Sequence, residues 1–438
     1  MKILFLTTYN VSLEREHFFT INVWKELSKL SGSNLASVLF SEHLLESEIH
    51  VEERDGRNYY ILTVPQSYSN DKDYILNSII KLFEYVSPDI VHSNMIEGYD
   101  IEAAKHLNIP IVLTIHIGGF ICPRGGGNGF LMYDDSICNQ RVGRICMKCG
   151  CMDLPLPYLS YALLRILPKH FIRYISTKIE NRNLFYITPL INKYIYIFNR
   201  IKYIQLMSYA HVIAANHKLV YLLEKNAIPK ENIHLIPHGV KRRDKLPFPA
   251  YNGKVKFYYL GRIQYSKGLH VLMKSLEGID KNKYELHIIG DAESRRKEQR
   301  YYSHIRTLSK DKSVIFHGRL PNERIEEVIQ DCHVMVHPTI CLEVYGIAIA
   351  ESLSMGRPVL ATKCGGAEMQ VEDGYNGWLI DPNSVAEMRN KIIYIINHFE
   401  EVRTCAEKAR LPHSIELYSS ELQCAYKKII QSYKVDVA

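Results

Sequence analysis

The 438-residue sequence contains no uninterrupted apolar run that approaches the roughly 20 residues needed to cross a bilayer as a helix. It also lacks the pattern of a secretory signal, because Met1–Thr7 predicts a buried strand without an extended apolar core or a small-residue cleavage site. Neither charge dominates: 54 Lys and Arg residues face 47 Asp and Glu residues, and the net charge is +7. We therefore expect a cytoplasmic protein whose modest positive charge is compatible with an anionic ligand or surface.

Two common nucleotide-binding patterns are also missing. No G-x-G-x-x-G follows the apolar runs Lys2–Thr7 and Val255–Leu260, and the loop after the second run lacks the G-x-x-x-x-G-K spacing of a Walker loop. These absences argue against a dinucleotide-dependent oxidoreductase and against a Walker-type phosphate loop. The composition is that of a folded globular protein, with 47% hydrophobic and 23% charged residues, and the length is sufficient for two domains.

Short apolar runs alternate with helix-length segments along both halves of the chain. In the N-terminal half these runs are Lys2–Thr7, Leu35–Phe40, Tyr59–Val64, Asp89–His92, Ile111–Ile115, Val212–Ala215 and Ile233–Ile236. In the C-terminal half they are Val255–Leu260, Tyr284–Gly290, Ser313–His317, Val334–His337 and Val359–Thr362. Uniformly apolar strands separated by helices are typical of parallel sheets with both faces covered. The pattern predicts an α/β fold of two facing, doubly wound Rossmann-like domains.

The domain boundary is predicted near Gly239–Lys245, a polar stretch between two apolar runs. We assign residues 1–242 to an N-terminal domain and residues 243–412 to a C-terminal nucleotide-binding domain. Residues 413–438 are expected to form a terminal helix that packs back on the N-terminal domain.

Residues 152–210 interrupt the alternating pattern. The segment is rich in Leu, Ile, Tyr and Phe, yet it holds eight Lys or Arg residues against Asp153 and Glu180, so its net charge is 8 − 2 = +6. Aromatic and aliphatic residues mixed with bases are typical of an amphipathic surface that lies in a membrane interface. The alternative is a helical insertion that packs on its own domain and leaves the bases solvated. The first interpretation predicts a peripheral protein at the inner face of the cell membrane.

The sharpest motif is the run Cys341–Pro358, which follows a predicted strand. Within it, Gly346–Ser354 predicts a helix, with Glu343 in the preceding loop and Glu351 well inside the helix. A helix start at the carboxyl edge of a parallel sheet presents N–H groups to an anion, and open α/β sheets bind nucleotides at this edge. A carboxylate deeper in the helix can accept two ribose hydroxyls. Two glutamates on one helix are usually surface charge, but the apolar neighbours Ile347–Ala350 make a spare carboxylate costly.

A second motif, Tyr259–Gly268, follows the first strand of the C-terminal half. Arg262 and Lys267 on this glycine-flanked loop can clamp a diphosphate, Arg through a bidentate fork and Lys as a point charge. Further glycine loops follow strand ends at Gly290-Asp291, His317-Gly318-Arg319 and Gly365-Gly366-Ala367-Glu368. Glycine at these positions permits a close backbone approach, although simple turns would also explain it.

Taken together, these motifs resemble the retaining glycosyltransferases of family 4, which have the GT-B fold. The resemblance covers residues from about 255 to 382 closely, and it includes Asp373-Gly374-Tyr375-Asn376-Gly377 beside the motifs above. The N-terminal half matches more loosely, through Asp89-Ile90-Val91-His92, Leu113-Thr114-Ile115-His116 and Ile236-Pro237-His238-Gly239-Val240. The resemblance implies a hexosyltransferase-type enzyme that moves a sugar from a nucleotide-sugar donor to a glycan or lipid-linked acceptor. Bacterial-type surface polysaccharide or glycolipid synthesis is the expected setting, and the donor's anomeric configuration would be retained.

The resemblance also implies roles for single residues. Arg262 and Lys267 are expected to bind the donor diphosphate and to stabilise its departing charge. Glu351 is expected to hold the ribose, and Glu343 to face the donor sugar. The other expected donor contacts are Gly290, Gly318, Tyr345, Gly346 and Ile347. A UDP-sugar is the favoured donor, and no catalytic metal is expected because Arg and Lys do the cation's work.

His116 ends a predicted strand and resembles the family histidine that contacts the donor sugar from the N-terminal domain. The alternative is a hydrogen-bonded strand-end histidine with no part in the reaction. The sequence departs from the family after its first strand, where many members carry paired glycines, whereas Thr7–His17 contains none. This departure leaves the acceptor open.

Five of the ten cysteines gather in one segment of the N-terminal half. In a chain of this length, cysteines indicate free thiols in a reducing compartment rather than a disulfide scaffold. Cys146 and Cys149 form a C-x-x-C pair, and Cys122 and Cys138 flank a glycine-rich loop. Four such thiolates match a closed tetrahedral zinc site, with Cys151 as a substitute ligand, although the spacing is not a standard ribbon. The alternative is reduced, unliganded thiols. The segment also resembles a subgroup of family 4 with cysteines here, which favours a structural zinc.

Two other enzyme classes are also compatible with parts of this sequence. A GT-B sugar-nucleotide epimerase or hydrolase would rearrange or cleave its donor without needing a membrane, and the basic insertion at residues 152–210 favours the transferase over it. A dinucleotide-dependent oxidoreductase would also have two parallel-sheet domains, but it would carry the missing glycine fingerprint. The expected partners are a nucleotide sugar, an acceptor and the cytoplasmic membrane surface, and no nucleic acid.

Overall fold

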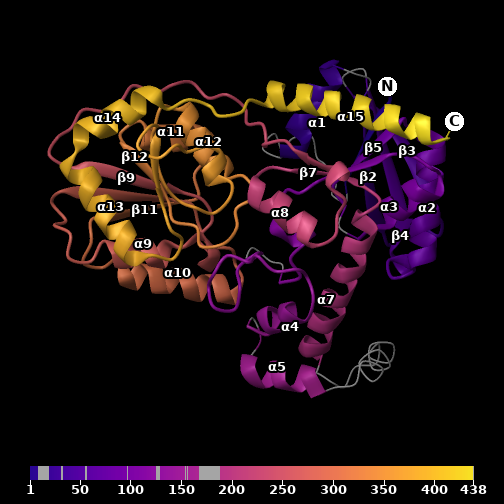
Figure 1. The fold of residues 1–438 in the computed structure, drawn as a ribbon, viewed down its shortest axis with the longest axis horizontal. Helices are drawn as coiled ribbons and strands as arrows, with labels where there is room; N and C mark the ends of the chain where they lie inside the picture. The colour runs from indigo at the N-terminus through magenta and orange to yellow at the C-terminus, as the bar shows by residue number, and fades with distance from the viewer. Residues whose placement is uncertain are drawn as a thin grey trace. The chain divides into compact units, whose positions relative to one another are not determined.

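The computed structural model describes residues 1–7, 19–30, 33–54, 57–95, 97–124, 129–152, 154, 156–166 and 188–437. The chain splits into two compact units. The first unit comprises Met1–His116, Ile195–Gly239 and Ile415–Ala438, and the second comprises Ile117–Tyr194 and Val240–Ser414. Each unit is built around one sheet that is covered by helices (Figure 1).

The sheet of the first unit has eight strands in the order β3-β4-β2-β1-β5-β6-β7-β8. Its parallel strands are β1 (Ile3–Thr7), β2 (Ser33–Ser41), β4 (Arg57–Pro65), β5 (Ile90–Ser93), β6 (Ile111–Thr114), β7 (His211–Ala214) and β8 (Ile233–Leu235). The strand β3 (Glu48–Arg54) pairs antiparallel with β4 at the edge. All five residues of β1 are buried, as expected for an apolar central strand with both faces covered.

The helices of the first unit are α1 (Phe19–Leu30), α2 (Lys72–Val86), α3 (Tyr99–His106), α8 (His217–Lys225), α15 (Ile415–Val437) and most of α7 (Thr188–Met207). The Asp71 carboxylate begins α2 by accepting a hydrogen bond from the Tyr74 N–H. The C-terminal helix α15 lies beside α1 (Figure 1), and its Tyr426 packs with Phe5 and Trp24 in one core. The end of the chain thus belongs to the first unit.

The sheet of the second unit has six parallel strands in the order β11-β10-β9-β12-β13-β14. They are β9 (Val255–Leu260), β10 (Tyr284–Ile289), β11 (Val314–Gly318), β12 (Val334–His337), β13 (Val359–Thr362) and β14 (Gly377–Ile380). Side chains of β9 alternate between two cores: Phe257 and Tyr259 lie in one, and Tyr258 lies in the other.

The first of these cores packs under α9 (Leu269–Ser275), α10 (Arg296–Leu308), α13 (Val385–Asn397) and α14 (Phe399–Lys408), and the second under α11 (Asn322–Ile329) and α12 (Ile347–Ser354). Figure 1 shows α11 and α12 on one side of the strands and α9 and α10 on the other. The 3₁₀ turns of the described chain are η1 (Gln66–Tyr68), η2 (Gly118–Phe120), η3 (Lys230–Asn232), η4 (Tyr265–Lys267) and η5 (Ala367–Met369).

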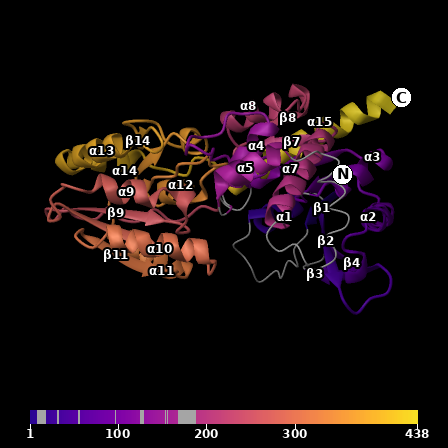
Figure 2. The same cartoon turned by 90° about the horizontal axis from the view of Figure 1, so that it is seen from below.

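The cysteine-rich segment, residues 117–152, belongs to the second unit, whereas the sequence placed it in the N-terminal domain. Its helix α4 (Arg144–Cys151) lies beside α5 (Pro157–Ile166), as Figure 2 shows. The predicted insertion at residues 152–210 therefore contributes to both units, and residues 153, 155 and 167–187 lie outside the described residues. Within the described chain, no helix combines the length and the hydropathy needed to cross a membrane.

Contacts between distant parts of the chain explain the different assignment of this segment. Leu131 lies in a buried cluster with Val271 and Ile340 of the C-terminal half. The Tyr265 hydroxyl donates to the Asp135 carboxylate at 2.7 Å, across 130 positions of sequence. No local sequence pattern indicates such contacts, so the segment was assigned by its neighbours in the chain.

Candidate active site

The loops after β9 and β12 meet at the carboxyl edge of the second sheet. The strand order reverses at this point, because β9 lies between β10 and β12, and open α/β sheets bind ligands at such a switch point. Gly268 ends the first loop with φ +71°, and a Cβ at this position would meet the Pro338 carbonyl oxygen at 1.9 Å. Glycine therefore lets the loop that carries Lys267 lie directly against the loop that leads to Glu343.

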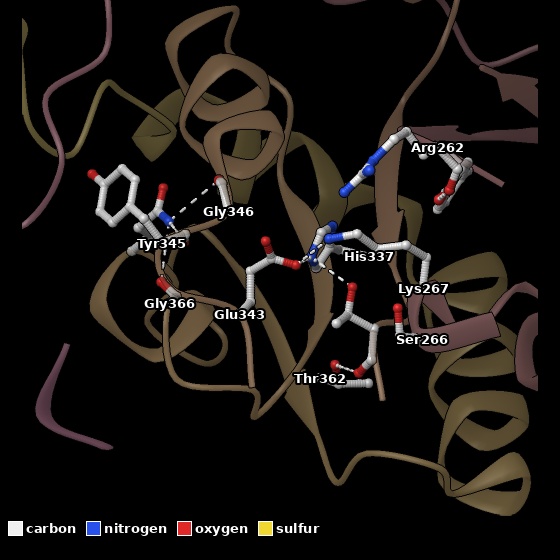
Figure 3. A network of polar contacts seen from close by, with 12 residues as sticks. Arg262, Ser266, Lys267, His337, Glu343, Tyr345, Gly346, Thr362 and Gly366 are labelled. Atoms are coloured by element: carbon white, nitrogen blue, oxygen red, sulfur yellow. Dashed lines mark hydrogen bonds and ion pairs between the residues drawn. The ribbon is translucent and has the colours of Figure 1, made fainter. Parts of the chain in front are cut away.

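Three titratable side chains meet where these loops touch. The Lys267 ammonium, from η4, forms an ion pair with the Glu343 carboxylate. His337, the last residue of β12, places Nε2 3.6 Å from the same carboxylate oxygen and 2.9 Å from Thr339 Oγ1. Figure 3 shows the lysine and the histidine converging on Glu343. The structure thus brings together two predicted site residues and adds His337, which the sequence analysis treated only as the end of a strand.

The Glu343 carboxyl group is ionised in this buried setting. Burial alone would raise its pKa, but Lys267 and then His337 lower the pKa of Glu343 far below its ordinary value of 4.5. Burial lowers the pKa of Lys267, but Glu343 outweighs it and raises that pKa above 10.5. Burial lowers the pKa of His337, so its ring is neutral at pH 7. The site therefore holds one charged pair beside a neutral imidazole.

Arg262 lies on the same loop but has a different partner. Its Nη1 is 3.1 Å from the Glu293 carboxylate, and its side chain is 58% exposed. Figure 3 shows Arg262 on the same side of the site as Lys267. The two cations that the sequence predicts for a diphosphate thus border one region, Lys267 from a partly buried ion pair and Arg262 from the solvent-facing side.

The glycine loops after β9, β10 and β11 lie next to one another. The Gly290 N–H donates to the Gly318 carbonyl at 2.8 Å, and the Gly261 N–H donates to the Ile289 carbonyl at 3.0 Å. A Cβ on Gly290 would meet the Gly261 carbonyl oxygen at 1.9 Å. The predicted donor contacts Gly290 and Gly318 therefore form a continuous backbone edge that leads to Arg262.

The start of α12 forms another part of the site. Gly346 is its N-cap with φ +86°, and Gly366 approaches so closely that a Cβ there would meet the Tyr345 carbonyl oxygen at 2.2 Å. The Gln370 amide donates to the Tyr345 and Gly346 carbonyls. Ile347, the first helical residue, is 41% exposed. A helix start held in place and open to solvent favours an anion at its N–H groups.

Glu351 lies in the second turn of α12 and is turned toward a residue that the sequence analysis did not single out. Its Oε1 is 3.0 Å from Arg243 Nη2, and Arg243 Nη1 is 2.6 Å from Glu326 Oε1. From the sequence, Arg243 was predicted only to be part of a polar linker. The basic character of Gly239–Lys245 was the available signal, but it does not name a partner.

His116 lies in the first unit, directly after β6 and Ile115. Its Nε2 is 2.5 Å from Asn94 Oδ1, and its ring centroid is 5.4 Å from that of His238. Burial lowers the pKa of His116 to about 4, so the ring is neutral at pH 7. These contacts are compatible with both interpretations of His116, as a sugar contact or as a structural strand-end residue.

Four cysteines of residues 117–152 lie near enough for their charges to interact, namely Cys122, Cys138, Cys146 and Cys149. Cys122, Cys146 and Cys149 are buried, and Cys138 is partly exposed. Burial raises the pKa of Cys146 to about 12, and the charges of Cys122, Cys138 and Cys149 contribute to that rise. Among the described residues, however, no group of three or more His, Cys, Asp or Glu side chains has the arrangement of a metal site. A structural zinc stays a prediction.

Residues 240–411 match the family model of glycosyl transferases group 1. An uncharacterized glycosyltransferase of Methanocaldococcus jannaschii is 28% identical over 157 residues, which cover 35% of this chain and 41% of that protein. The D-rhamnosyltransferase WbpZ of Pseudomonas aeruginosa is 25% identical over 193 residues, 44% of this chain and 46% of that protein. The O-antigen chain mannosyltransferase C of Escherichia coli is 28% identical over 160 residues, 35% and 40% of the two chains. This chain therefore spans less than half the length of these curated relatives.

Solved structures resemble the chain over nearly its whole length. Anabaena Alr3699/HepE, in complex with UDP and glucose, has a TM-score of 0.63 at 16% identity and covers 98% of this chain and 99% of its own. Sucrose-phosphate synthase from Thermosynechococcus elongatus has a TM-score of 0.64 at 13% identity, with 99% and 100% covered. Likeness at such identity concerns the fold alone. The chain has the GT-B fold of two Rossmann-like units, and its second unit carries a glycosyl transferases group 1 region at residues 240–411.

Proposed function

We propose that this protein is a glycosyltransferase that moves a sugar from a nucleotide-sugar donor to a glycan or lipid-linked acceptor. The observation that carries the proposal is the partly buried network of Lys267, Glu343 and His337 beside the start of α12, within the matched region. A cation, an ionised carboxylate and a helix N-terminus at one sheet edge can bind a diphosphate and stabilise the charge that develops as it leaves.

The residues divide the work as follows. The diphosphate is bound by Lys267, Arg262 and the start of α12. The Glu351 carboxylate accepts hydrogen bonds from the ribose hydroxyls. A diphosphate competes with Glu343 for the Lys267 ammonium. Glu343 then keeps His337 as its neighbour and turns its second oxygen to the donor sugar. Because Lys267 and Arg262 carry positive charge, they can stabilise the leaving diphosphate in the transition state.

The finer assignment is to family 4 of the retaining enzymes, in the subgroup with a cysteine-rich loop. The order of the glycine, cation and glutamate motifs supports the family, and Cys122, Cys138, Cys146 and Cys149 support the subgroup. Retention is expected to follow from attack on the face that the diphosphate leaves. An NMR analysis of the product anomer tests this directly, and an inverted product would contradict the assignment.

We propose that the acceptor lies at a membrane surface. Two of the relatives are named for rhamnose transfer and for mannose transfer to O-antigen, which supports a role in surface polysaccharide or glycolipid synthesis. The helix α5 exposes large apolar side chains to solvent, including Tyr158 at 74% and Ile166 at 78%. Together with the basic residues of 152–210, this face supports a peripheral position at the inner side of the cell membrane.

A donor screen followed by an activity assay tests the function. Thermal shifts with UDP-, GDP- and ADP-sugars should identify one donor, because a ligand at about 100 times its Kd adds about 2.7 kcal/mol of stability. The Lys267→Ala variant should lose that shift. Transfer of the sugar to a lipid-linked acceptor from membranes supports the proposal. No stabilisation by any donor overturns it, and conversion only to free sugar or an epimer favours an epimerase or hydrolase.

A further inference from the structure

We infer that Arg243 is a positioning residue that holds the Glu351 carboxylate ready for the ribose of the donor nucleotide. The inference rests on the proposed function, because it concerns the same donor site. Arg243 lies in the stretch Gly239–Lys245 that leads from β8 to β9. Its guanidinium forms ion pairs with two carboxylates outside the Lys267–Glu343 pair, those of Glu351 and Glu326.

The guanidinium of Arg243 bridges two helices. Nη2 is 3.0 Å from Oε1 of Glu351 on α12, and Nη1 is 2.6 Å from Oε1 of Glu326 on α11. The Arg243 and Glu351 side chains are 19% and 23% exposed, whereas Glu326 is 42% exposed, so Glu351 is the more buried of the two partners. A planar guanidinium can donate to two acceptors in fixed directions, which a lysine ammonium on a flexible stem cannot reproduce.

The backbone of Arg243 is fixed to the same helix that carries Glu351. The Arg243 N–H donates to Ser354 Oγ at 2.9 Å, and the Ser354 hydroxyl lies 3.0 Å from the Arg243 carbonyl, to which it can donate. Ser354 is the last residue of α12 and lies three positions after Glu351. The guanidinium thus extends from a point that is already tied to α12, so holding Glu351 costs little further conformational entropy.

This arrangement leaves Glu351 able to bind a ribose. Each carboxylate oxygen offers two acceptor sites, so one bond to Arg243 leaves capacity for two hydroxyl donors. The ion pair also holds the Glu351 side chain in one direction, because the Arg243 backbone is itself hydrogen-bonded to the end of α12. A carboxylate that is already oriented discriminates against a nucleotide that lacks the ribose 2′-hydroxyl, because one hydrogen bond to the carboxylate is then not formed. Arg243 should therefore affect the preference for ribose over deoxyribose.

The test compares Arg243→Ala with Arg242→Ala, a matched control at the neighbouring exposed position. Calorimetric Kd values are measured for UDP and 2′-deoxy-UDP, and for the GDP pair if GDP binds more tightly. Arg243→Ala should weaken binding of the ribonucleotide about tenfold, the scale of one hydrogen bond to a charged group, and bring the ribo-to-deoxyribo ratio close to one. Arg243→Lys should recover only part of that ratio. Arg242→Ala should match the wild type.

A double-variant cycle separates positioning from a general structural effect. In a Glu351→Ala background, Arg243→Ala should add no further loss of nucleotide affinity. An additive loss, or a wild-type ribo-to-deoxyribo ratio in Arg243→Ala, overturns the inference even when Glu351→Ala itself weakens binding. If Arg243→Ala does not fold, Arg243→Lys replaces it, both alone and combined with Glu351→Ala. The ribo-to-deoxyribo affinity ratio is then compared in the same way. If neither Glu351→Ala nor Lys267→Ala changes nucleotide affinity, the proposed function fails instead.

Discussion

At the scale of single residues, the two glutamates of the donor motif have different neighbours and should have different effects when replaced. Glu351 contacts Arg243, whereas Glu343 contacts Lys267 and His337. We predict that Glu351→Ala weakens nucleotide binding and that Glu343→Ala mainly lowers kcat. Nucleotide Kd and steady-state rates for both variants check the prediction, with Glu327→Ala on the surface of α11 as control. Unchanged nucleotide affinity in Glu351→Ala would contradict the ribose assignment.

The two cations proposed to bind the diphosphate, Arg262 and Lys267, should both affect the rate. Arg262→Ala and Lys267→Ala should each cost about 2–4 kcal/mol of transition-state stabilisation, read from kcat/KM, because each removes a charge that the leaving group requires. Arg295→Ala is a matched control for Arg262, since Arg295 is also exposed and also pairs with Glu293. An Arg262→Ala enzyme within a few-fold of wild type would show that the exposed cation plays no part.

The low pKa of Glu343 predicts a specific acid sensitivity. Its pKa in the folded protein lies below the ordinary value of 4.5, so the unfolded chain takes up the proton first as the pH falls. The pair with Lys267 therefore contributes stability above about pH 4.5, and that contribution is lost progressively below it. We expect Glu343→Gln to have a flatter acid limb than wild type in urea unfolding from pH 7 to about pH 3. Parallel profiles would mean that the pair does not contribute.

Residue type and spacing singled out Arg262, Lys267 and both glutamates as candidate site residues, because cations and carboxylates beside glycine in an apolar context stand out locally. The same reasoning missed His337, which ends an apolar run and looks like part of a strand. It also missed Arg243, whose partner Glu351 lies 108 positions away. Both contacts depend on which strands become neighbours in the sheet, and no short stretch of sequence contains that information.

At the scale of elements, the cysteine-rich segment carries a separate prediction. We expect about one zinc per chain, held by Cys122, Cys138, Cys146 and Cys149, because four thiols in one segment match the ligand type and number of a structural zinc site, although no group among the described residues is arranged to hold a metal. Metal analysis of protein purified without chelator or metal-affinity resin checks this. Cys146→Ser should lower the zinc content, and Cys424→Ser, at an exposed thiol on α15, should not. Zinc-free protein with four titratable thiols would support the alternative of reduced thiols.

The strands were the most predictable elements. Every predicted apolar run coincides with a strand to within two residues at each end, since a central parallel strand must be apolar on both faces. Two edge strands were missed. The strand β3 has the sequence EIHVEER, whose charges suit a solvent-facing edge, and β14 begins at a glycine after a turn. Edges need less apolar sequence, so their signal is weaker.

At the scale of the whole molecule, the two units differ in what their sequence reveals. The family match at residues 240–411 lies within the second unit, which also carries the predicted donor motifs. The first unit resembles the solved structures in its fold alone. The stretch Thr7–His17, which lacks the paired glycines, lies outside the described residues apart from Thr7. Roles for single residues can therefore be predicted on the donor side. The acceptor side follows only from the relatives and from the surface of residues 152–210.

The surface of residues 152–210 predicts reversible binding to anionic membranes. On α5, Leu159, Leu163 and Ile166 are exposed and spaced so that they share one helix face, beside the exposed Arg165. Apolar area entering the interface contributes about 25 cal/mol per Å². Each base near anionic lipid adds about 1 kcal/mol. The further bases Lys169, Arg173, Lys178 and Arg182 follow in the sequence but lie outside the described residues.

Liposome co-sedimentation separates an interfacial surface from a merely basic one. Binding should require anionic lipid, decrease with salt, and weaken when Arg165, Lys169 and Arg173 are replaced by Glu, because both terms act together. Leu159→Ser with Leu163→Ser should weaken it as well, whereas Leu45→Ser, at a still more exposed leucine of the first unit, should not. If only the charge substitutions weaken liposome binding, the apolar face of α5 does not enter the membrane interface. If wild-type protein stays in the supernatant with anionic vesicles at low salt, the membrane proposal is wrong and a soluble acceptor is the better explanation.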